Sequence, residues 1–522
     1  MSMLKMDVAW ADLSQVPKWE SGTIVVGNGS LAPYPHPALE TLLVRTDGRW
    51  FVVVRERRAG NEGEGRMSAQ DVTSERFEQL HRASLLWPLD YVMVEAAEQG
   101  CRVKLRAGVL GSAPVYCRAT GERLHVSWDF ADFLAEKLPI DFEVASCSLA
   151  LEQTYSARQL CVGVHLLTER ATFHLEPGRA QYRYPATFQL PAHGNLQEMF
   201  DVVGAFDQHL RRVLEARPMS AARISVELSG GMDSAAVACA LAADYGSVMS
   251  YGVLVSGECR AAQIERREKI VAVLGLSDET ADIDELPPSL DLGLTERPSY
   301  VNTEYYLEAF ESLWQRAHAQ GCDSVFSGLG GDELFMGSSA HGMDGAGIGD
   351  PTLAESRSSA SRLLTRKAAV AAHSLRAFDA PTGPVPSVMA SASRAHHLMQ
   401  HGLWPINPLS DPALMVFCHQ LPPEYRRKRS LIHRYLSAGL GKDVFPPQYA
   451  KETFAHVFPR LIARHRGGIA RQLRECALSD AGLVERDAVL SLLDEVAISQ
   501  SPALAAPLVN FIWLERFARR LL

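Results

Sequence analysis

The stretch with the clearest chemistry is ISVELSGGMDSAAVACALAA, residues 224–243. Its β-branched alternation gives way to Ala and Val, which predicts a buried strand, a tight turn and, after Ser234, a helix. Gly230 and Gly231 allow the backbone to turn sharply and to approach a ligand closely. The hydroxyls of Ser229 and Ser234, the N–H groups of the turn and the positive end of the helix together predict an anion site, most naturally for phosphate.

Asp233 lies inside this turn, where its carboxylate would repel a bound phosphate. A Mg²⁺ ion between them would remove the conflict, since Mg²⁺ binds carboxylate and phosphate oxygens. Tight strand-to-helix turns also occur in α/β proteins that bind no phosphate, so the SGG segment by itself leaves that alternative open. The full SGGMDS segment resembles the pyrophosphate loop of enzymes that cleave ATP to AMP and pyrophosphate. It is not a Walker loop, because the chain contains no G-x-x-x-x-G-K-[ST].

A second glycine turn, SGLGGDELFMG at residues 327–337, has the same construction and adds the acids Asp332 and Glu333. If both turns follow adjacent parallel strands, Asp233 and Asp332 meet at one edge of the sheet, where they would bind one Mg²⁺ with phosphate oxygens. Asp332 could instead cap a helix, and Glu333 could lie in its first turn. In combination with SGGMDS we predict a metal ligand at Asp332, and the role of Glu333 stays open.

The segments around the two turns alternate between strand and helix. We predict an amphipathic helix at 196–215, strands at 224–228, 248–255, 279–283 and 323–327, and helices at 261–274 and 303–320. Such alternation is typical of a parallel, doubly wound sheet, in which ligands bind beyond the carboxyl ends of the strands.

Helices are predicted to dominate after residue 362. The Gly- and Ser-rich segment 337–361 is predicted to be a long mobile loop, either an uninvolved insertion or a lid over the site. Pro381, Pro384 and Pro386 predict another break.

The first 190 residues are predicted to be rich in strands and to form stacked antiparallel sheets. Candidate strands lie at 22–26, 41–44, 50–55, 103–110, 115–118, 123–128 and 180–184, with a helix near 130–137.

Composition excludes several classes of function. A length of 522 residues predicts two or more domains, and a net charge of −9 makes nonspecific binding to nucleic acid or anionic membrane unlikely as a main role. No window of about 18 apolar residues is present to span a membrane. The first residues lack the apolar core of a signal peptide, so we expect a cytoplasmic protein. The nine cysteines are scattered without a C-x-x-C pair, which argues against a disulfide framework or a zinc site.

Two further segments accompany the glycine turns: PINPLSD at residues 405–411, and Lys451 followed by Glu452. Together with SGGMDS and SGLGGDE, they resemble the class B asparagine synthetase superfamily. Its synthetase domain activates a carboxylate as an acyl-adenylate and passes it to an amine. The resemblance implies ATP and Mg²⁺ as cofactors, and an ATP-pyrophosphatase domain at residues 191–522 with a doubly wound parallel sheet and added helices.

The N-terminal half resembles the amidotransferase domain of the same superfamily. The segment RAGVLGSAPVYCRATGERLHVSWDFADFL, residues 106–134, is similar to its strand-turn-strand core, and HLEPGRAQYRY, residues 174–184, is similar to its exit strand. The implied fold class is α/β plus α+β, with a sandwich-like amidotransferase-type domain at residues 1–190.

Two departures distinguish between subfamilies. A glutamine-using member needs Cys as its first mature residue, but Ser2 and Met3 follow Met1 here, so we expect no thiol nucleophile and no glutaminase activity. Leu329 stands in the second turn where asparagine synthetases carry Glu and β-lactam synthetases carry Tyr. The chain is then most similar to the lasso-peptide macrolactam synthetases (lasso cyclases). These adenylate an Asp or Glu side chain of a threaded ribosomal peptide and join it to the peptide's N-terminal amine, releasing AMP and pyrophosphate.

The resemblance also implies residue roles and partners. Lys451 would stabilise charge on the adenylate phosphate or the tetrahedral intermediate, as a preorganised cation should. Asp233 and Asp332 would hold Mg²⁺, and Asp332 also counts as catalytic. The residues expected to bind the nucleotide are Ser229, Gly230, Gly231, Met232, Asp233, Ser234, Gly328 and Arg429. The implied partners are a precursor peptide, a leader-binding protein and a leader peptidase, with no nucleic acid and no membrane span.

The loss of a base at position 329 is tolerable on physical grounds. Keeping an α-amino group with a pKa of about 7.8 neutral at pH 7 costs only about 1 kcal/mol, whereas holding amine and acyl-adenylate in contact can supply roughly 7 kcal/mol or more. Three alternatives stay open: a β-lactam synthetase-like cyclase of a small β-amino acid, an asparagine synthetase that uses ammonia, and a nucleotide-binding scaffold without catalysis. Leu329 counts against the first, and intact Asp233, Asp332 and Lys451 count against the last.

Overall fold

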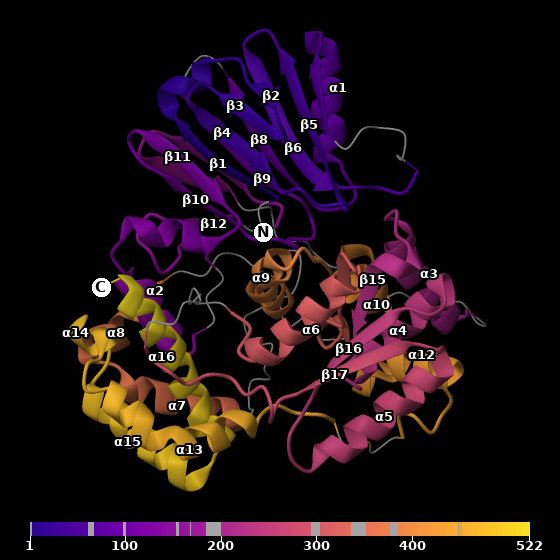
Figure 1. Cartoon of the computed structure of the whole chain (residues 1–522), viewed down its shortest axis with the longest axis vertical. Coiled ribbons are helices and arrows are strands. Elements are labelled where there is room, and N and C mark those ends of the chain that lie inside the picture. Colours follow the sequence, from indigo (N-terminus) through magenta and orange to yellow (C-terminus); the bar gives the residue numbers. More distant parts are fainter. Residues whose placement is uncertain are drawn as a thin grey trace.

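The computed structural model describes residues 3–60, 67–97, 101–152, 156–167, 169–183, 200–293, 303–335, 351–375, 385–446, 449 and 451–521. Two stacked, mainly antiparallel sheets form the N-terminal half, drawn in indigo and purple in Figure 1. A five-stranded parallel sheet with helices on both faces lies at the centre of the C-terminal half. These observations confirm the predicted fold class.

Each sheet of the N-terminal half has seven strands. The first has the order β12 (His165–Leu167), β10 (Val115–Ala119), β11 (Arg123–Ser127), β1 (Leu4–Ala9), β4 (Gly29–Pro33), β3 (Thr23–Val26) and β2 (Lys18–Glu20). The second has the order β14 (Arg179–Arg183), β13 (Thr172–Glu176), β9 (Val103–Ala107), β8 (Tyr91–Ala97), β6 (Arg49–Glu56), β5 (Leu39–Thr46) and β7 (Met67–Asp71). Only the β5–β7 pair is parallel among the described pairs of these sheets.

Alternate side chains of these strands fill the space between the sheets. Met6 of β1 and Val52 of β6 belong to this core. Phe51 of β6 points the other way and packs with Phe77 of α1 (Ser74–Leu85). The strand β6 is therefore buried on both faces, which accounts for its continuous apolar run instead of an alternating one.

The predicted strands of the N-terminal half all fall on observed strands, but others were missed. The missed strands are β1, β2, β4, β7, β8, β12 and β13, and the missed helices are α1 and α2 (Phe142–Leu149). The helix predicted near 130–137 is a 3-10 helix at Phe130–Glu136. Short polar edge strands such as β7, MSAQD, have no apolar alternation, so pattern alone cannot identify them.

The parallel sheet has the order β17 (Ser277–Asp282), β16 (Met249–Leu254), β15 (Ile224–Glu227), β18 (Ser324–Phe326) and β19 (Trp404–Ile406). Helices α3 (Val202–Glu215), α4 (Met232–Tyr245) and α12 (Ser430–Leu440) pack with one face, α6 (Leu307–Ala319) and α9 (Val385–Gln400) lie against the other, and α5 (Cys259–Leu274) follows β16. The predicted strands and the helices predicted at 261–274 and 303–320 are present within a few residues. The helix predicted at 196–215 begins only at Val202, and residues 196–199 lie outside the described residues. The strand β19 was not predicted, because three residues containing a proline carry no strand signal.

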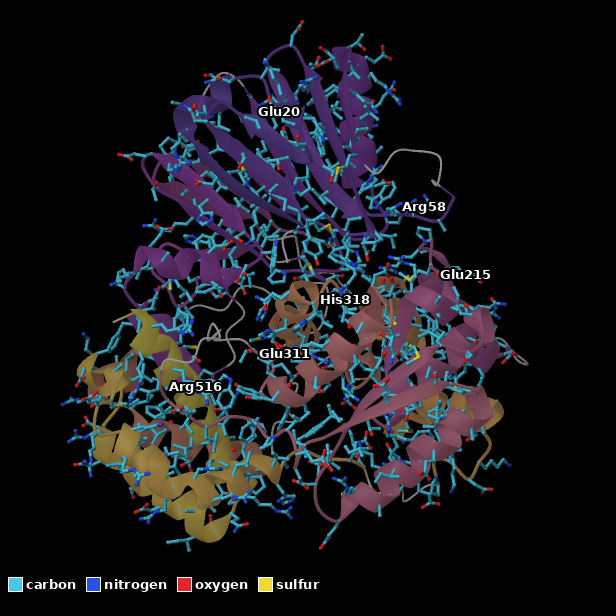
Figure 2. The ribbon with its side chains drawn as sticks, viewed as in Figure 1. Glu20, Arg58, Glu215, Glu311, His318 and Arg516 are labelled. Atoms are coloured by element: carbon cyan, nitrogen blue, oxygen red, sulfur yellow. The ribbon has the colours of Figure 1, made fainter. Side chains whose placement is uncertain are left out.

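Further helices form a separate layer with its own core, shown in orange and yellow in Figure 1. They are α7 (Pro351–Leu363), α8 (Arg366–Ala371), α13 (Val457–Gln472), α14 (Ala477–Asp480), α15 (Arg486–Ser499) and α16 (Pro502–Leu521). The two short helices α10 (Pro412–Gln420) and α11 (Pro423–Arg426) lie near the parallel sheet. Arg516 of α16 donates through Nε to the carbonyl of Asp291 at 2.5 Å, which joins the layer to the parallel-sheet part (Figure 2).

The predicted loop at 337–361 is wrong for its second part, because α7 begins at Pro351. Its small residues let the helix pack closely on α16, where the Ser356 hydroxyl donates to the carbonyl of Ala503 at 2.9 Å. Residues 337–350 lie outside the described residues, as do Pro381 and Pro384. Pro386 does not break the chain as predicted, since it lies in the first turn of α9, where proline is tolerated.

Buried polar contacts join the N-terminal half to the parallel-sheet part. Glu56 at the end of β6 accepts from Arg217 (Nη2, 2.8 Å) and from the indole of Trp404 in β19 (2.7 Å). Tyr34 donates to the carbonyl of Met399 at 2.7 Å. The predicted domain boundary after residue 190 falls outside the described residues and stays a prediction. No helix among the described residues is long and apolar enough to cross a membrane.

Candidate active site

The first glycine turn connects β15 to α4 and is shaped by its own hydroxyls. The Ser229 amide donates to Ser234 Oγ (3.1 Å), the Gly231 amide donates to Ser229 Oγ (3.1 Å), and Ser234 Oγ donates to the Gly231 carbonyl (3.1 Å). Gly230 has φ +90°, a conformation that L side chains rarely adopt. The helix begins at Met232 instead of after Ser234, so Asp233 lies in its first turn, at the end that attracts anions.

The second glycine turn follows β18 and touches the first. A Cβ at Gly331 would lie 2.2 Å from Asp233 Cγ, and one at Gly328 would lie 2.6 Å from the Ser234 amide nitrogen. Glycines at 328 and 331 are therefore required for the two turns to approach. As predicted, the two turns meet at one edge of the sheet.

The PINPLSD segment forms hydrogen bonds with the second turn. Ser327 Oγ donates to Asn407 Oδ1 at 2.6 Å, and Ser410 Oγ donates to the Leu329 carbonyl at 3.1 Å. Gly330, with φ +95°, leaves no room for a side chain beside Ser410. This segment therefore fixes the backbone of the turn that carries Asp332.

Four of the predicted site residues form one charge cluster. Arg429 pairs with Asp233 and, through Nη1, with Asp332 Oδ1 at 2.9 Å. Lys451 Nζ lies 3.5 Å from Asp332 Oδ2. Since one guanidinium contacts both carboxylates, Asp233 and Asp332 both lie within reach of a single cation.

The backbone at Arg429 is strained. Lys428 and Arg429 have φ of +51° and +58°, in the left-handed region that favours glycine. Consecutive non-glycine residues in this conformation cost free energy and persist only where the surroundings impose them. Burial lowers the pKa of the Arg429 guanidinium, and its Nε has no hydrogen-bond partner among the described residues. An unsatisfied donor on a residue that pairs with both acids suits a ligand oxygen.

Three residues of the site were missed by the sequence analysis. Glu452 accepts from Ser229 Oγ (3.2 Å) and pairs with Arg266 Nη2 (2.9 Å), while Arg266 Nε donates to the Gly230 carbonyl (3.0 Å). Gln263 donates to the Ser229 carbonyl at 2.8 Å. Glu452 could have been found as the neighbour of Lys451, but Arg266 and Gln263 on α5 look in sequence like any polar helix residues.

The donor set fits ATP with Mg²⁺. The turn supplies hydrogen-bond donors for phosphate, and two carboxylates face one position beside it. Among the described residues no group of three or more His, Cys, Asp or Glu could hold a metal alone. Asp233 and Asp332 would hold the ion together with phosphate oxygens and water, the ligands that are usual for Mg²⁺. Burial raises the pKa of the Glu333 carboxyl, next to Asp332.

Leu329 lines a small cavity together with Glu227 and Arg394. Arg394 of α9 binds both oxygens of Glu227 at 2.7 Å, and its Nε lies 3.1 Å from Glu304. Glu227 ends β15, two residues before Ser229. A buried ion-pair network therefore lies directly beneath the two glycine turns.

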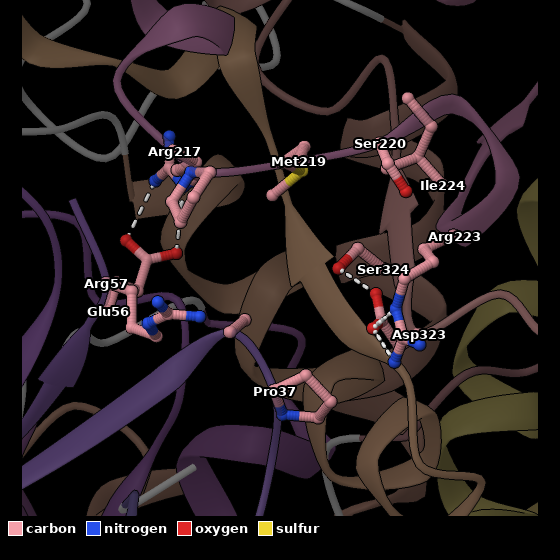
Figure 3. A pocket seen from close by; sticks show the side chains of 12 residues that line it. Pro37, Glu56, Arg57, Arg217, Met219, Ser220, Arg223, Ile224, Asp323 and Ser324 are labelled. Carbon is pink, nitrogen blue, oxygen red and sulfur yellow. Dashed lines mark hydrogen bonds and ion pairs between the residues drawn. The ribbon is translucent and has the colours of Figure 1, made fainter. Parts of the chain in front are cut away.

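A cavity of about 430 Å³ lies elsewhere (Figure 3). Its lining includes Ile224 and Ser324, at the amino ends of β15 and β18, and the paired residues Glu56 and Arg217. The glycine turns follow the carboxyl ends of the same strands. This cavity is therefore not the site of the charge cluster.

Comparison with known proteins finds a family match within the parallel-sheet part of the chain. The family model described as asparagine synthase matches residues 205–387, a range that contains both glycine turns. No curated protein matches the chain significantly. Among solved structures, the U34-tRNA thiolase NcsA from Methanococcus maripaludis, with its [4Fe-4S] cluster, is similar at 15% identity and a TM-score of 0.25, over 57% of this chain and 80% of that one. Residues 205–387 are thus similar to the asparagine synthase family.

Proposed function

We propose that this protein is an ATP-dependent, AMP-forming ligase that closes an amide bond within a ribosomal peptide, as lasso cyclases do. The observation that carries the proposal is the contact between the two glycine turns, which gathers Asp233, Asp332, Arg429 and Lys451 at one anion-binding helix end. The asparagine synthase match over residues 205–387, which include Asp233 and Asp332, supports amide formation with ATP.

In the first step a carboxylate oxygen of an Asp or Glu side chain attacks the α-phosphorus of ATP, and the bond to the pyrophosphate oxygen breaks. The amides of the first turn and the Ser229 hydroxyl hold the pyrophosphate. Asp233 and Asp332 would hold Mg²⁺, which neutralises phosphate charge when bound. Arg429 exchanges its carboxylate partners for phosphate oxygens, starting from its unpaired Nε.

In the second step the N-terminal amine of the same peptide attacks the acyl carbon. The bond to AMP breaks, and the amine proton passes to water. Lys451 stabilises the oxyanion or the leaving phosphate, because a fixed cation near developing charge lowers the barrier.

The choice of an internal amine over ammonia is supported by two features. Leu329 provides no base. The acceptor amine must therefore lose its proton easily and must be held in place. In the N-terminal half, Cys117, Cys147 and Cys161 are buried whereas Cys101 is exposed, and burial raises the pKa of the Cys161 thiol to about 12. A protonated, buried thiol cannot attack glutamine to release ammonia.

The test is an incubation of the full chain with Mg-ATP and linear peptides that start with Gly and carry Asp or Glu about seven to nine residues in. Products are identified by mass spectrometry and by nucleotide chromatography. Loss of one water from the peptide with formation of AMP, absent in Asp233→Asn, is the expected result. A leader-binding protein and a leader peptidase are included in a parallel reaction, since we propose both as partners.

Other outcomes identify the alternatives. AMP formed only with a small β-amino acid or with ammonia and aspartate would assign one of the other amide-forming reactions. ADP in place of AMP would overturn adenylation. No turnover even with the partner proteins would favour a nucleotide-binding scaffold.

A further inference from the structure

A second large cavity lies where three distant parts of the chain meet. It measures about 360 Å³ and is lined by the N-terminal half, by α7 and α9, and by α16. Its apolar lining includes Tyr116, Phe130, Leu166, Leu353 and Val388. The volume falls in the range of cavities that bind small organic groups.

Two chain segments connect the cavity lining to the candidate active site. Ser387 on α9 lies near Glu333, the residue after Asp332, and the next residues, Val388 and Met389, line the cavity. The cavity wall therefore includes Val388, the residue after Ser387, and Ser387 lies near the second glycine turn.

The second segment includes Tyr305, which also lines the cavity. The preceding residue, Glu304, belongs to the ion-pair network of Arg394 and Glu227 beneath the glycine turns. The two connections use different elements, so the closeness of cavity and site does not depend on one contact.

Several polar groups of the cavity wall already have partners. Arg158 binds Asp141 (2.7 Å) and Glu143 (2.6 Å). Asn510 donates to the Ser148 carbonyl at 2.7 Å. A polar occupant would therefore find few free partners and would lose its contacts with water, which favours an apolar occupant.

The backbone is strained at one wall residue, Leu151, which has φ +56°. It follows α2, where the Glu152 amide donates to the Cys147 carbonyl at 3.1 Å, a helix end at which glycine is usual. Leu in this place keeps an apolar branched side chain at the cavity despite the unfavourable backbone.

We propose that this cavity seats a large apolar side chain, aromatic or branched aliphatic, of the peptide that is cyclised. The inference rests on the proposed function and deepens it, because it makes the N-terminal half one wall of the substrate site. Tyr116, Phe130 and Leu151 then bind substrate where a glutamine-hydrolysing domain would supply ammonia.

The experiment is photocross-linking of the full chain. Linear peptides of the kind described above carry p-benzoylphenylalanine at each position in turn and are irradiated without ATP. Benzophenone groups insert readily at methionine, and Met389 lies in the cavity wall. We expect one or a few positions to cross-link to Met389, with the site mapped by mass spectrometry.

Matched variants test the assignment. Ala392→Phe and Ala506→Phe add a ring to the cavity lining, while Ala354→Phe adds one on exposed surface of α7. We expect the first two to lower the cross-link yield at Met389 at least tenfold and to raise KM for the peptide tenfold, with KM for ATP unchanged, and the third to change nothing. Ala506 is itself exposed, so its variant keeps the test valid if Ala392→Phe does not fold.

Failure of this inference is distinguishable from failure of the proposed reaction. AMP formation with cross-links only outside the cavity, or with unchanged yield and KM in both filled variants, overturns the inference and leaves the reaction intact. Cross-linking at Met389 without AMP formation supports binding of a peptide side chain in the cavity and overturns the proposed reaction. Neither cross-link nor AMP with any peptide overturns both.

Discussion

At the scale of single residues, Arg429 determines the charge balance of the site. One guanidinium pairs with Asp233 and Asp332, and Lys451 lies beside Asp332, so two cations balance the two acids that would hold Mg²⁺. On binding of Mg-ATP, the two carboxylates would hold the ion and Arg429 would pair with phosphate oxygens. In the free protein the cations keep the repulsion between the two carboxylates from destabilising the site.

Lys451 is expected to act mainly on the rate. Because it lies at the edge of the cluster, 59% exposed and 3.5 Å from Asp332, Lys451→Ala should leave the fold and KM for ATP nearly unchanged. It should lower kcat about 100-fold or more, as loss of a preorganised charge-stabilising group does. Steady-state kinetics of AMP release measure both constants. Lys442→Ala, at an exposed lysine away from the cluster, is the control, and equal kcat values for the two variants would remove Lys451 from catalysis.

Glu452 is expected to matter for stability and for the shape of the turn. Its pair with Arg266 is nearly buried, with side chains 9% and 7% exposed. Glu452→Gln leaves that guanidinium without its charged partner, which should lower the free energy of unfolding by about 3 kcal/mol. Urea unfolding measures the change, and isothermal titration should show weaker ATP binding through Ser229. Glu268→Gln, exposed on the same helix as Arg266, should do neither; an equal effect would contradict the assignment.

At the scale of elements, the sequence was most informative where local chemistry sets the structure. The strand, glycine turn and helix around Gly230 were predictable because periodicity and turn residues agree. The left-handed backbone at Lys428 and Arg429 was not, since neither residue type signals it. The burial of Arg266 could not be predicted either, because it depends on Glu452, 186 positions later in the chain. The helix α7 was missed because its Ser- and Gly-rich surroundings resemble a loop, and only packing against α16 stabilises it.

The approach of the two turns is expected to depend on Gly331. In Gly331→Ala the new Cβ would lie 2.2 Å from Asp233 Cγ, so the carboxylate must move. A shift of about 1 Å at a reacting centre can cost about 100-fold in rate, so kcat should fall at least that far. The control is Gly467→Ala on α13, where a Cβ meets nothing within 4 Å and where alanine should stabilise the helix by roughly 0.5–1 kcal/mol. Near-normal kcat in Gly331→Ala would show that the turns separate without loss.

At the scale of the whole molecule, the junction between the halves depends on contacts that no local pattern predicts. Glu56, Arg217 and Trp404 are far apart in sequence and form one buried group. Glu56→Gln replaces an oxygen that accepts hydrogen bonds with an amide that donates. We expect it to lower the free energy of unfolding by about 3–5 kcal/mol, as breaking a buried ion pair does. Thermal melting measures the loss; Glu20→Gln, exposed on β2, is the control, and matching melting temperatures for the two would contradict the role of Glu56.

Asp90 beside this junction should make stability depend on pH. Burial, and after it the charge of Glu56, raises the pKa of the Asp90 carboxyl to about 6. Below about pH 4 the group is protonated in both the folded and the unfolded chain. Between pH 4 and 6 the unfolded chain releases the proton while the folded chain keeps it, so the free energy of unfolding falls as pH rises. Above pH 6 the folded chain also releases the proton, and the free energy of unfolding stays lower by the full cost of burying the Asp90 carboxylate. A shift of about two pKa units corresponds to about 3 kcal/mol.

The Asn variant at this position isolates that titration. Other carboxyl groups titrate in the same range, but they are common to both proteins and cancel in the difference. Asp90→Asn itself does not titrate, so its free energy of unfolding relative to the wild type should rise by about 3 kcal/mol from pH 4 to pH 7. Urea unfolding at several pH values gives both curves. Parallel curves would mean that Asp90 is ionised in the folded protein, and that the junction tolerates a second buried carboxylate beside Glu56.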